Sequence, residues 1–245
     1  MFLLLSGEGA SDIGTQDNEI GPMTKFVDNW VAQHIGYSLI DRNYYRIVTK
    51  QALSKVAKEE LNPLSKRGKK NKPETAFFYK NARALARLAN KESSERNLPV
   101  IVVLFRDADG TASSERGEWQ DKVQSMLNGF EAEKLNGFEA ENIFYGVPMI
   151  PKPKSEAWIL CGLRNNYQNC QQLENESGND ASPNSLKQQL EQHLGERATR
   201  VLLNDKIDEG LLDISMIVDM PSLTAFKNRL DEVLDLIYYK PKPKN

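Results

Sequence analysis

Three short, uninterrupted apolar runs stand out along the chain, and acidic residues follow each of them. The runs are residues 2–5, 100–105 and 143–147, and branched side chains dominate them. Runs of this length and composition are typical of strands buried on both faces of a parallel sheet. The segments between them carry apolar residues at helical spacing. This order predicts an α/β fold with right-handed crossovers.

Helical periodicity places helices from Pro22 onward and over residues 49–61, 77–97, 115–127, 156–163, 186–194, 197–212 and 223–237. Residues 44–48 give a weaker strand signal. Residues 165–184 are rich in Asn, Gln and Ser, so we expect an exposed loop there. Residues 127–142 repeat one short unit almost identically. A single doubled unit is too short for a repeat fold, so it is expected to lengthen a helix or a loop.

These elements predict a Rossmann-like, mostly parallel sheet flanked by helices over residues 1–163. A helical and basic insertion is expected at about 49–97. Residues 164–245 are expected to form a helical C-terminal appendage that ends in a basic tail, because Lys and Pro alternate over 240–244.

The composition restricts the class of protein but does not indicate a function. The 245 residues are 40% hydrophobic and 27% charged, as in ordinary soluble globular proteins, and the net charge of -2 does not by itself indicate nucleic acid. Cys161 and Cys170 lack CxxC spacing, so we expect neither a disulfide framework nor a zinc site, and a cytoplasmic setting. No apolar run approaches the roughly 20 residues that span a bilayer, so no membrane partner is expected.

The acidic residues are the candidate chemistry. Glu8 and Asp12 follow the first apolar run, Asp107 and Asp109 follow the second, and Glu156 follows the third. The carboxyl ends of parallel strands meet at one edge of a sheet, where ligands bind. Carboxylates gathered there repel one another unless cations neutralise them, and hard divalent ions prefer oxygen ligands. The sequence therefore predicts a metal site at this edge.

Each motif also has a plainer interpretation. Asp107-x-Asp109 places both carboxylates on one side, but a DxDG segment is also a common turn at a helix entry. Glu8 lies between two glycines and could be a general acid or base, a metal ligand, or only a loop residue. Lys152 and Lys154 could neutralise a phosphate or be solvated loop lysines.

A basic run lies inside the expected insertion. It contains five cations with no intervening acid: Lys66, Arg67, Lys69, Lys70 and Lys72. Such a run could bind nucleic-acid phosphates, and it could equally be a solvated loop.

Taken together, the motifs resemble a known family. Leu3-Leu4-Leu5-Ser6-Gly7-Glu8-Gly9 with Asp12, followed by Val102 to Gly110, resembles the TOPRIM fold of topoisomerases, primases and OLD-type nucleases. The segment Pro151-x-x-x-Ser155-Glu156-Ala157-Trp158-Ile159-Leu160 is similar to the third acidic motif of the OLD-nuclease branch, whose members are often encoded in bacterial antiviral defence systems. The resemblance spans roughly residues 1–163. No Gly-x-x-x-x-Gly-Lys-Ser/Thr segment is present, so an ATPase would have to be a separate subunit.

The resemblance implies a Mg²⁺-dependent nuclease, with Mn²⁺ as a possible substitute, that hydrolyses phosphodiester bonds of DNA or RNA. Glu8, Asp107, Asp109 and Lys154 would be catalytic. Glu8, Asp12, Asp107, Asp109 and Glu156 would bind metal. A catalytically silent TOPRIM-like subunit that binds nucleic acid or a partner, and a small-molecule phosphohydrolase, stay open as alternatives.

Overall fold

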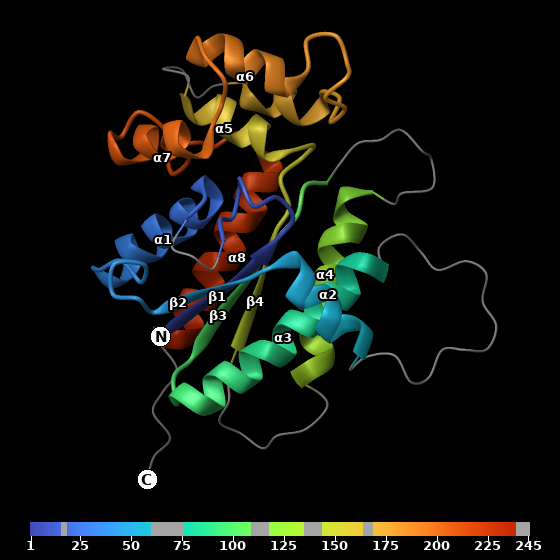
Figure 1. Ribbon diagram of the computed structural model, residues 1–245, viewed down its shortest axis with the longest axis vertical. Helices are drawn as coiled ribbons and strands as arrows, with labels where there is room; N and C mark the ends of the chain where they lie inside the picture. Colours follow the sequence, from blue (N-terminus) through green and yellow to red (C-terminus); the bar gives the residue numbers. More distant parts are fainter. Residues whose placement is uncertain (16–18, 60–75, 109–117, 135–143, 164–168, 239–245) are drawn as a thin grey trace, which may run out of the picture.

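A four-stranded, all-parallel sheet forms the centre of the molecule (Figure 1). The structure is a computed structural model that describes residues 1–15, 19–59, 76–108, 118–134, 144–163 and 169–238. The strands are β1 (Phe2–Gly7), β2 (Tyr45–Val48), β3 (Val100–Phe105) and β4 (Phe144–Met149), in the spatial order β2-β1-β3-β4. The predicted α/β class with a parallel sheet flanked by helices is confirmed.

Helices cover both faces of this sheet. Alternate residues of β1 and β3 point to opposite sides, so the apolar runs feed two separate cores. On one side lie α1 (Pro22–Ile35) and α8 (Pro221–Tyr238). On the other lie α2 (Lys50–Glu59), α3 (Ala76–Arg96) and α4 (Trp119–Lys134). This burial on both faces explains why the strands read as continuous apolar runs.

A smaller group of helices lies beyond the carboxyl ends of the strands, at the top of Figure 1. It consists of α5 (Ser155–Leu163), the 3₁₀ segment η1 (Cys170–Asn175), α6 (Leu186–Leu194) and α7 (Arg200–Asp208). α5 is almost entirely buried and directly continues the chain from β4, so it joins this group to the sheet. Among the described residues, no helix is both long and apolar enough to cross a membrane.

The first copy of the doubled unit is helical and belongs to α4. A Cβ on Gly129 would lie 2.3 Å from the carbonyl oxygen of Tyr79, so the glycine lets α4 pack closely against α3. The next residue, Phe130, is buried over Gly146 of β4. The helix therefore continues past residue 127, where the prediction ended it, because tertiary packing outweighs the low helix propensity of glycine. The second copy falls outside the described residues.

Three expectations about the C-terminal half need correction. Cys161 and Cys170 form a disulfide, with their Cα atoms 5.7 Å apart. The segment expected to be an exposed loop contains η1, in which Cys170, Leu173 and Glu174 are buried. Ser222 at the start of α8 anchors it, because its backbone N–H and hydroxyl donate to Glu174 Oε1 at 2.7 and 2.6 Å. α8 is also no appendage, because it packs on β4 and shares the core of the sheet.

Candidate acidic site at the carboxyl edge of the sheet

Glu8 and Asp107 lie at the same edge because they follow neighbouring parallel strands. Gly7 at the end of β1 pairs with Phe105 at the end of β3. The backbone N–H of Glu8 extends this pairing by donating to the carbonyl of Phe105 at 3.4 Å. The register of β1 and β3 therefore fixes both acids at one side of the sheet.

Asp12 reaches this edge through a tight loop after β1. The N–H groups of Asp12 and Ile13 both donate to the carbonyl of Gly9 at 3.2 Å, and the N–H of Met23 in α1 donates to the carbonyl of Asp12 at 2.9 Å. Gly9 has a φ of +88°, and a Cβ there would lie 2.4 Å from Asp12 Oδ2. Glycine is therefore needed at this position for the loop to bring Asp12 back toward the sheet.

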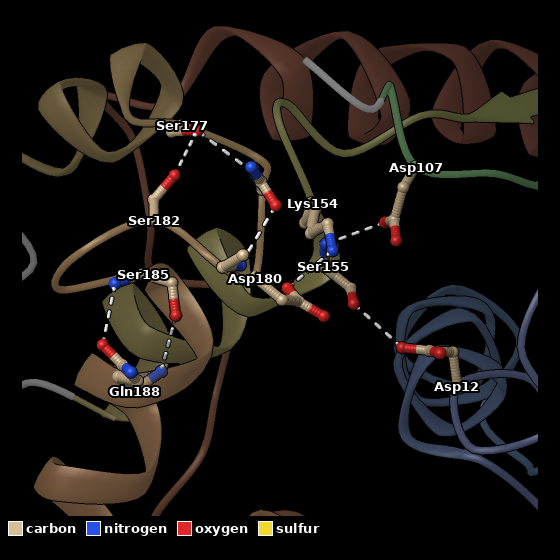
Figure 2. A network of polar contacts seen from close by, with 11 residues as sticks. Asp12, Asp107, Lys154, Ser155, Ser177, Asp180, Ser182, Ser185 and Gln188 are labelled. Atoms are coloured by element: carbon tan, nitrogen blue, oxygen red, sulfur yellow. Dashed lines mark hydrogen bonds and ion pairs between the residues drawn. The ribbon is translucent and has the colours of Figure 1, made fainter. Parts of the chain in front are cut away.

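Ser155 connects two of the acids, as Figure 2 shows. Its hydroxyl donates to Asp12 Oδ1 at 2.8 Å, and its backbone N–H donates to Asp107 Oδ1 at 2.9 Å. Ser155 itself is only 2% exposed. Since it begins α5, its N–H is one of the groups that a helix leaves without an internal partner. We call Asp12, Asp107, Ser155 and Glu156 the Ser155 cluster.

The Ser155 cluster holds two carboxyls that resist ionisation. Burial raises the pKa of Asp12, although hydrogen bonds from Ser155 and Ser11 and the charge of Lys154 act in the opposite direction. Burial also raises the pKa of Glu156, and the charges of Asp12 and Asp180 add to the rise, against Lys154. Both carboxylates would therefore be stabilised by a nearby cation.

Glu8 is held differently, by two cations that the sequence did not single out. Lys50, the first residue of α2, forms an ion pair with Glu8 Oε1, and Arg106 Nη2 lies 3.4 Å from Glu8 Oε2. Partial burial alone would raise the pKa of Glu8, but these two partners together hold it below the ordinary value. We call Glu8, Lys50 and Arg106 the Glu8 cluster.

The two lysines before α5 differ in their surroundings. Lys154 Nζ lies 2.8 Å from Asp180 Oδ1, and only 16% of its side chain is exposed (Figure 2). The charge of Lys154 also acts on Asp12 and Glu156. The backbone N–H of Lys152 donates to the hydroxyl of Ser222 at 3.3 Å, which ties this segment to α8. Lys154 is thus the lysine that belongs to the acidic edge.

The donor chemistry of the Ser155 cluster fits a hard divalent cation. Its oxygen donors are carboxylates, and Mg²⁺ often uses only one or two protein carboxylates together with waters and phosphate oxygens. Asp12 and Asp107, which share Ser155, could supply that number. In the described part of the chain, the one set of three possible ligand residues with atoms within 4.8 Å of one another lies elsewhere, at Cys161, Cys170 and Asp219. The disulfide occupies the two sulfurs of that set.

Several predicted site residues lie outside the described residues: Asp109 and the basic run of Lys66, Arg67, Lys69, Lys70 and Lys72. Three residues that contact the acids were not predicted from the sequence to do so: Ser155, Arg106 and Lys50. Ser155 is part of the third acidic motif, but the motif alone does not indicate that this serine links two acids. Arg106 immediately precedes Asp107, and Lys50 follows β2, so their positions at strand ends could have indicated the cationic partners of Glu8.

Comparisons with protein-family models, with curated proteins and with solved structures found no match.

Proposed function

We propose that this protein is a metal-dependent phosphodiesterase of TOPRIM-like type that cleaves DNA or RNA. The observation that carries the proposal is the link through Ser155, which joins acids from two different strand ends, Asp12 and Asp107. Glu156 follows Ser155 directly, and Glu8 lies on the neighbouring strand end. Acids from all three sequence motifs thus lie along one edge, where open parallel sheets bind their ligands.

Asp12, Asp107 and Glu156 would hold Mg²⁺ or Mn²⁺. When bound, the ion would polarise a phosphoryl oxygen and stabilise the charge that develops on it. Lys154 would lie beside the same phosphate, since its charge already acts on Asp12 and Glu156. Asp109 completes the expected set from outside the described residues. The TOPRIM resemblance and a role in bacterial antiviral defence are parts of this proposal.

The state of Glu8 favours one of its two predicted roles. A general base works best with a pKa near the working pH, and the ion pairs of Glu8 move its pKa in the other direction. Glu8 is therefore better suited to neutralising a cation than to accepting a proton.

One observation favours the alternative of a catalytically silent binding subunit. Lys50 and Arg106 neutralise Glu8 from within the protein, so this acid does not require a metal to offset its charge. In that case the edge would bind nucleic acid or a partner such as an ATPase subunit without cleaving. The partly buried Asp12 and Glu156 of the Ser155 cluster are the argument against this alternative, because burial penalises their charged forms.

The test is a cleavage assay with plasmid DNA and single-stranded RNA. We expect cleavage of one of them with Mg²⁺ or Mn²⁺ and none with EDTA. Glu156→Gln should lose cleavage, whereas Glu196→Gln, an exposed acid after α6, should match the wild type. Binding of nucleic acid without cleavage under every metal condition would support the silent subunit instead.

A further inference from the structure

Lys50 and Arg106 are cations at the acidic edge that the proposed chemistry does not yet use. Both contact Glu8, and all three side chains reach solvent, with exposed fractions of 52% for Lys50, 26% for Arg106 and 42% for Glu8. Ion pairs at such exposure are weak, because water and salt compete with them. Another anion of suitable geometry can therefore take the place of Glu8.

Arg106 is oriented and still has an unused donor. Its guanidinium lies 3.9 Å from the ring centre of Phe77 and 5.0 Å from that of Phe78. Its Nη2 faces Glu8, whereas its Nη1 is buried and has no hydrogen-bond partner among the described residues. Nη2 can therefore donate to a phosphate oxygen that takes the place of the Glu8 carboxylate, and a hydrogen bond between a guanidinium and a phosphate is among the strong charge-assisted ones.

Lys50 lies at the start of α2, where the helix itself favours an anion. The hydroxyl of Thr49 accepts from the N–H of Ala52 at 3.2 Å and so caps this helix. The partial positive charge of the helix N-terminus adds to the charge of Lys50. The two cations of the Glu8 cluster thus border one hollow at the end of β1, lined also by Phe77 and Asn81.

A second hollow begins at Lys50 and continues along α2. It is lined by Gln51, Ser54, Lys55 and Lys58 in addition to Lys50. Lys55 and Lys58 are exposed, are three residues apart on one side of the helix, and have no ion-pair partner in the part of the chain that the structure describes. A single phosphate would contact only Lys50 and Arg106, whereas a row of cations matches a row of phosphates.

We propose that Lys50 and Arg106 bind a phosphate of a nucleic-acid strand, that Glu8 occupies these cations until the strand arrives, and that the strand reaches them along Lys55 and Lys58. The substrate class rests on the proposed function, whereas the competition by Glu8 rests on the contacts alone. Glu8 then acts as an internal competitor. While its carboxylate contacts Lys50 and Arg106, it keeps free anions from binding to these two cations.

The first experiment measures binding of a short, labelled single-stranded oligonucleotide in EDTA by fluorescence anisotropy. Glu8→Gln removes the competitor, so binding should tighten roughly threefold to tenfold at low salt, and the gain should shrink as salt rises. Glu196→Gln makes the same charge change at an exposed site and should have no effect. In a Lys50→Gln background, Glu8→Gln should gain less. Equal affinity of wild type and Glu8→Gln would overturn the proposal.

The second experiment tests the path along α2. The double variant Lys55→Gln and Lys58→Gln should weaken oligonucleotide binding several-fold but leave inorganic phosphate binding unchanged, and Lys187→Gln should change neither. If the double variant binds the oligonucleotide as tightly as Lys187→Gln does, the strand does not run along Lys55 and Lys58. Because EDTA is present, neither result depends on cleavage. If Glu8→Gln tightens oligonucleotide binding but the protein never cleaves, the phosphate site stands and the proposed nuclease activity is rejected. If the protein cleaves but Glu8→Gln does not tighten binding, the nuclease activity stands and the phosphate site is rejected.

Discussion

At the β2 end of the acidic edge Glu8 lies between Lys50 and Arg106, whereas at the α5 end Asp12 and Glu156 lie among serine hydroxyls and other acids. The pKa of Glu8 is lowered, and the pKa values of Asp12 and Glu156 are raised. The pKa values of acids along one sheet edge are therefore shifted in opposite directions by their surroundings. In many active sites, two acids take different roles because their environments move their pKa values apart in this way.

The difference indicates where an external cation would stabilise the protein most. The Glu8 cluster already contains its counter-charges, so a metal there would have to displace Lys50 or Arg106. The Ser155 cluster has Lys154 nearby, but that lysine also pairs with Asp180. We therefore expect the first metal ion to bind at Asp12, Asp107 and Glu156, and the phosphate to bind nearer the Glu8 cluster.

The largest expected effect comes from removing a carboxylate of the Ser155 cluster. Asp107→Asn should reduce cleavage by about a hundredfold or more, because a metal that polarises a phosphoryl oxygen supplies several kcal/mol of transition-state stabilisation. Asp235→Asn, an exposed acid on α8, is the matched control. The measurement is the initial rate of plasmid or RNA cleavage in Mg²⁺. A rate equal to the control would exclude Asp107 from the metal site.

Metal binding should also be visible without catalysis. At a Mg²⁺ concentration of about 100 times Kd, binding should stabilise the folded state by ~2.7 kcal/mol, which raises Tm by roughly 5–10 °C in a domain of this size. The double variant Asp12→Asn and Glu156→Gln should lose this shift, and Glu8→Gln should keep most of it. Differential scanning fluorimetry with and without EDTA measures both. A shift lost only in Glu8→Gln would move the metal to the Glu8 cluster.

A smaller effect is expected in the pH dependence of stability. Because the folded-state pKa of Glu156 is raised, its contribution is fully present below the ordinary carboxyl pKa and is lost as pH rises through the folded value. Glu156→Gln removes this loss, so its free energy of unfolding should increase relative to wild type as pH rises from about 4 to 7. Urea unfolding at several pH values in EDTA gives the comparison. A constant difference across this range would contradict the raised pKa.

The smallest effect concerns the ion pair between Lys154 and Asp180. Asp180 is 53% exposed, so Asp180→Asn should cost only about 0.2–1 kcal/mol of stability. It would release Lys154 toward Asp12 and Glu156, which should lower their pKa values slightly. The check is the pH profile of stability in EDTA, which should become flatter than in wild type. An unchanged profile would show that neither Lys154 nor Asp180 acts on the cluster.

The strands were predictable from the local sequence because a strand that is buried on both faces is apolar at every position, whichever elements cover it. The runs in β1, β3 and β4 are apolar on both sides, and the sheet is covered on both sides. β4 extends beyond its predicted end to include Pro148, which pairs with Leu104. Proline is tolerated there because β4 is an edge strand, and strand order is not visible in a local pattern.

The site was predictable in part. Glu8 and Asp107 follow strands whose ends could be recognised, so their common edge follows from parallel pairing. The cations of the Glu8 cluster come from a helix start and from a residue beside a motif, and only the fold brings them together. Polar composition also misled, because Glu174 lies in a segment that appeared exposed yet is buried against Ser222.

The position of α8 has a consequence for how the chain is made. Its buried residues Phe226 and Leu230 belong to the core that covers one face of the sheet, and Arg229 donates to the carbonyl of Gly146 in β4 at 3.0 Å. During synthesis this face stays partly uncovered until residues 221–238 have been translated, although all four strands are complete by residue 149. The nascent protein therefore carries an exposed apolar surface while residues 150–238 are being made, which is the interval in which chaperones would recognise it.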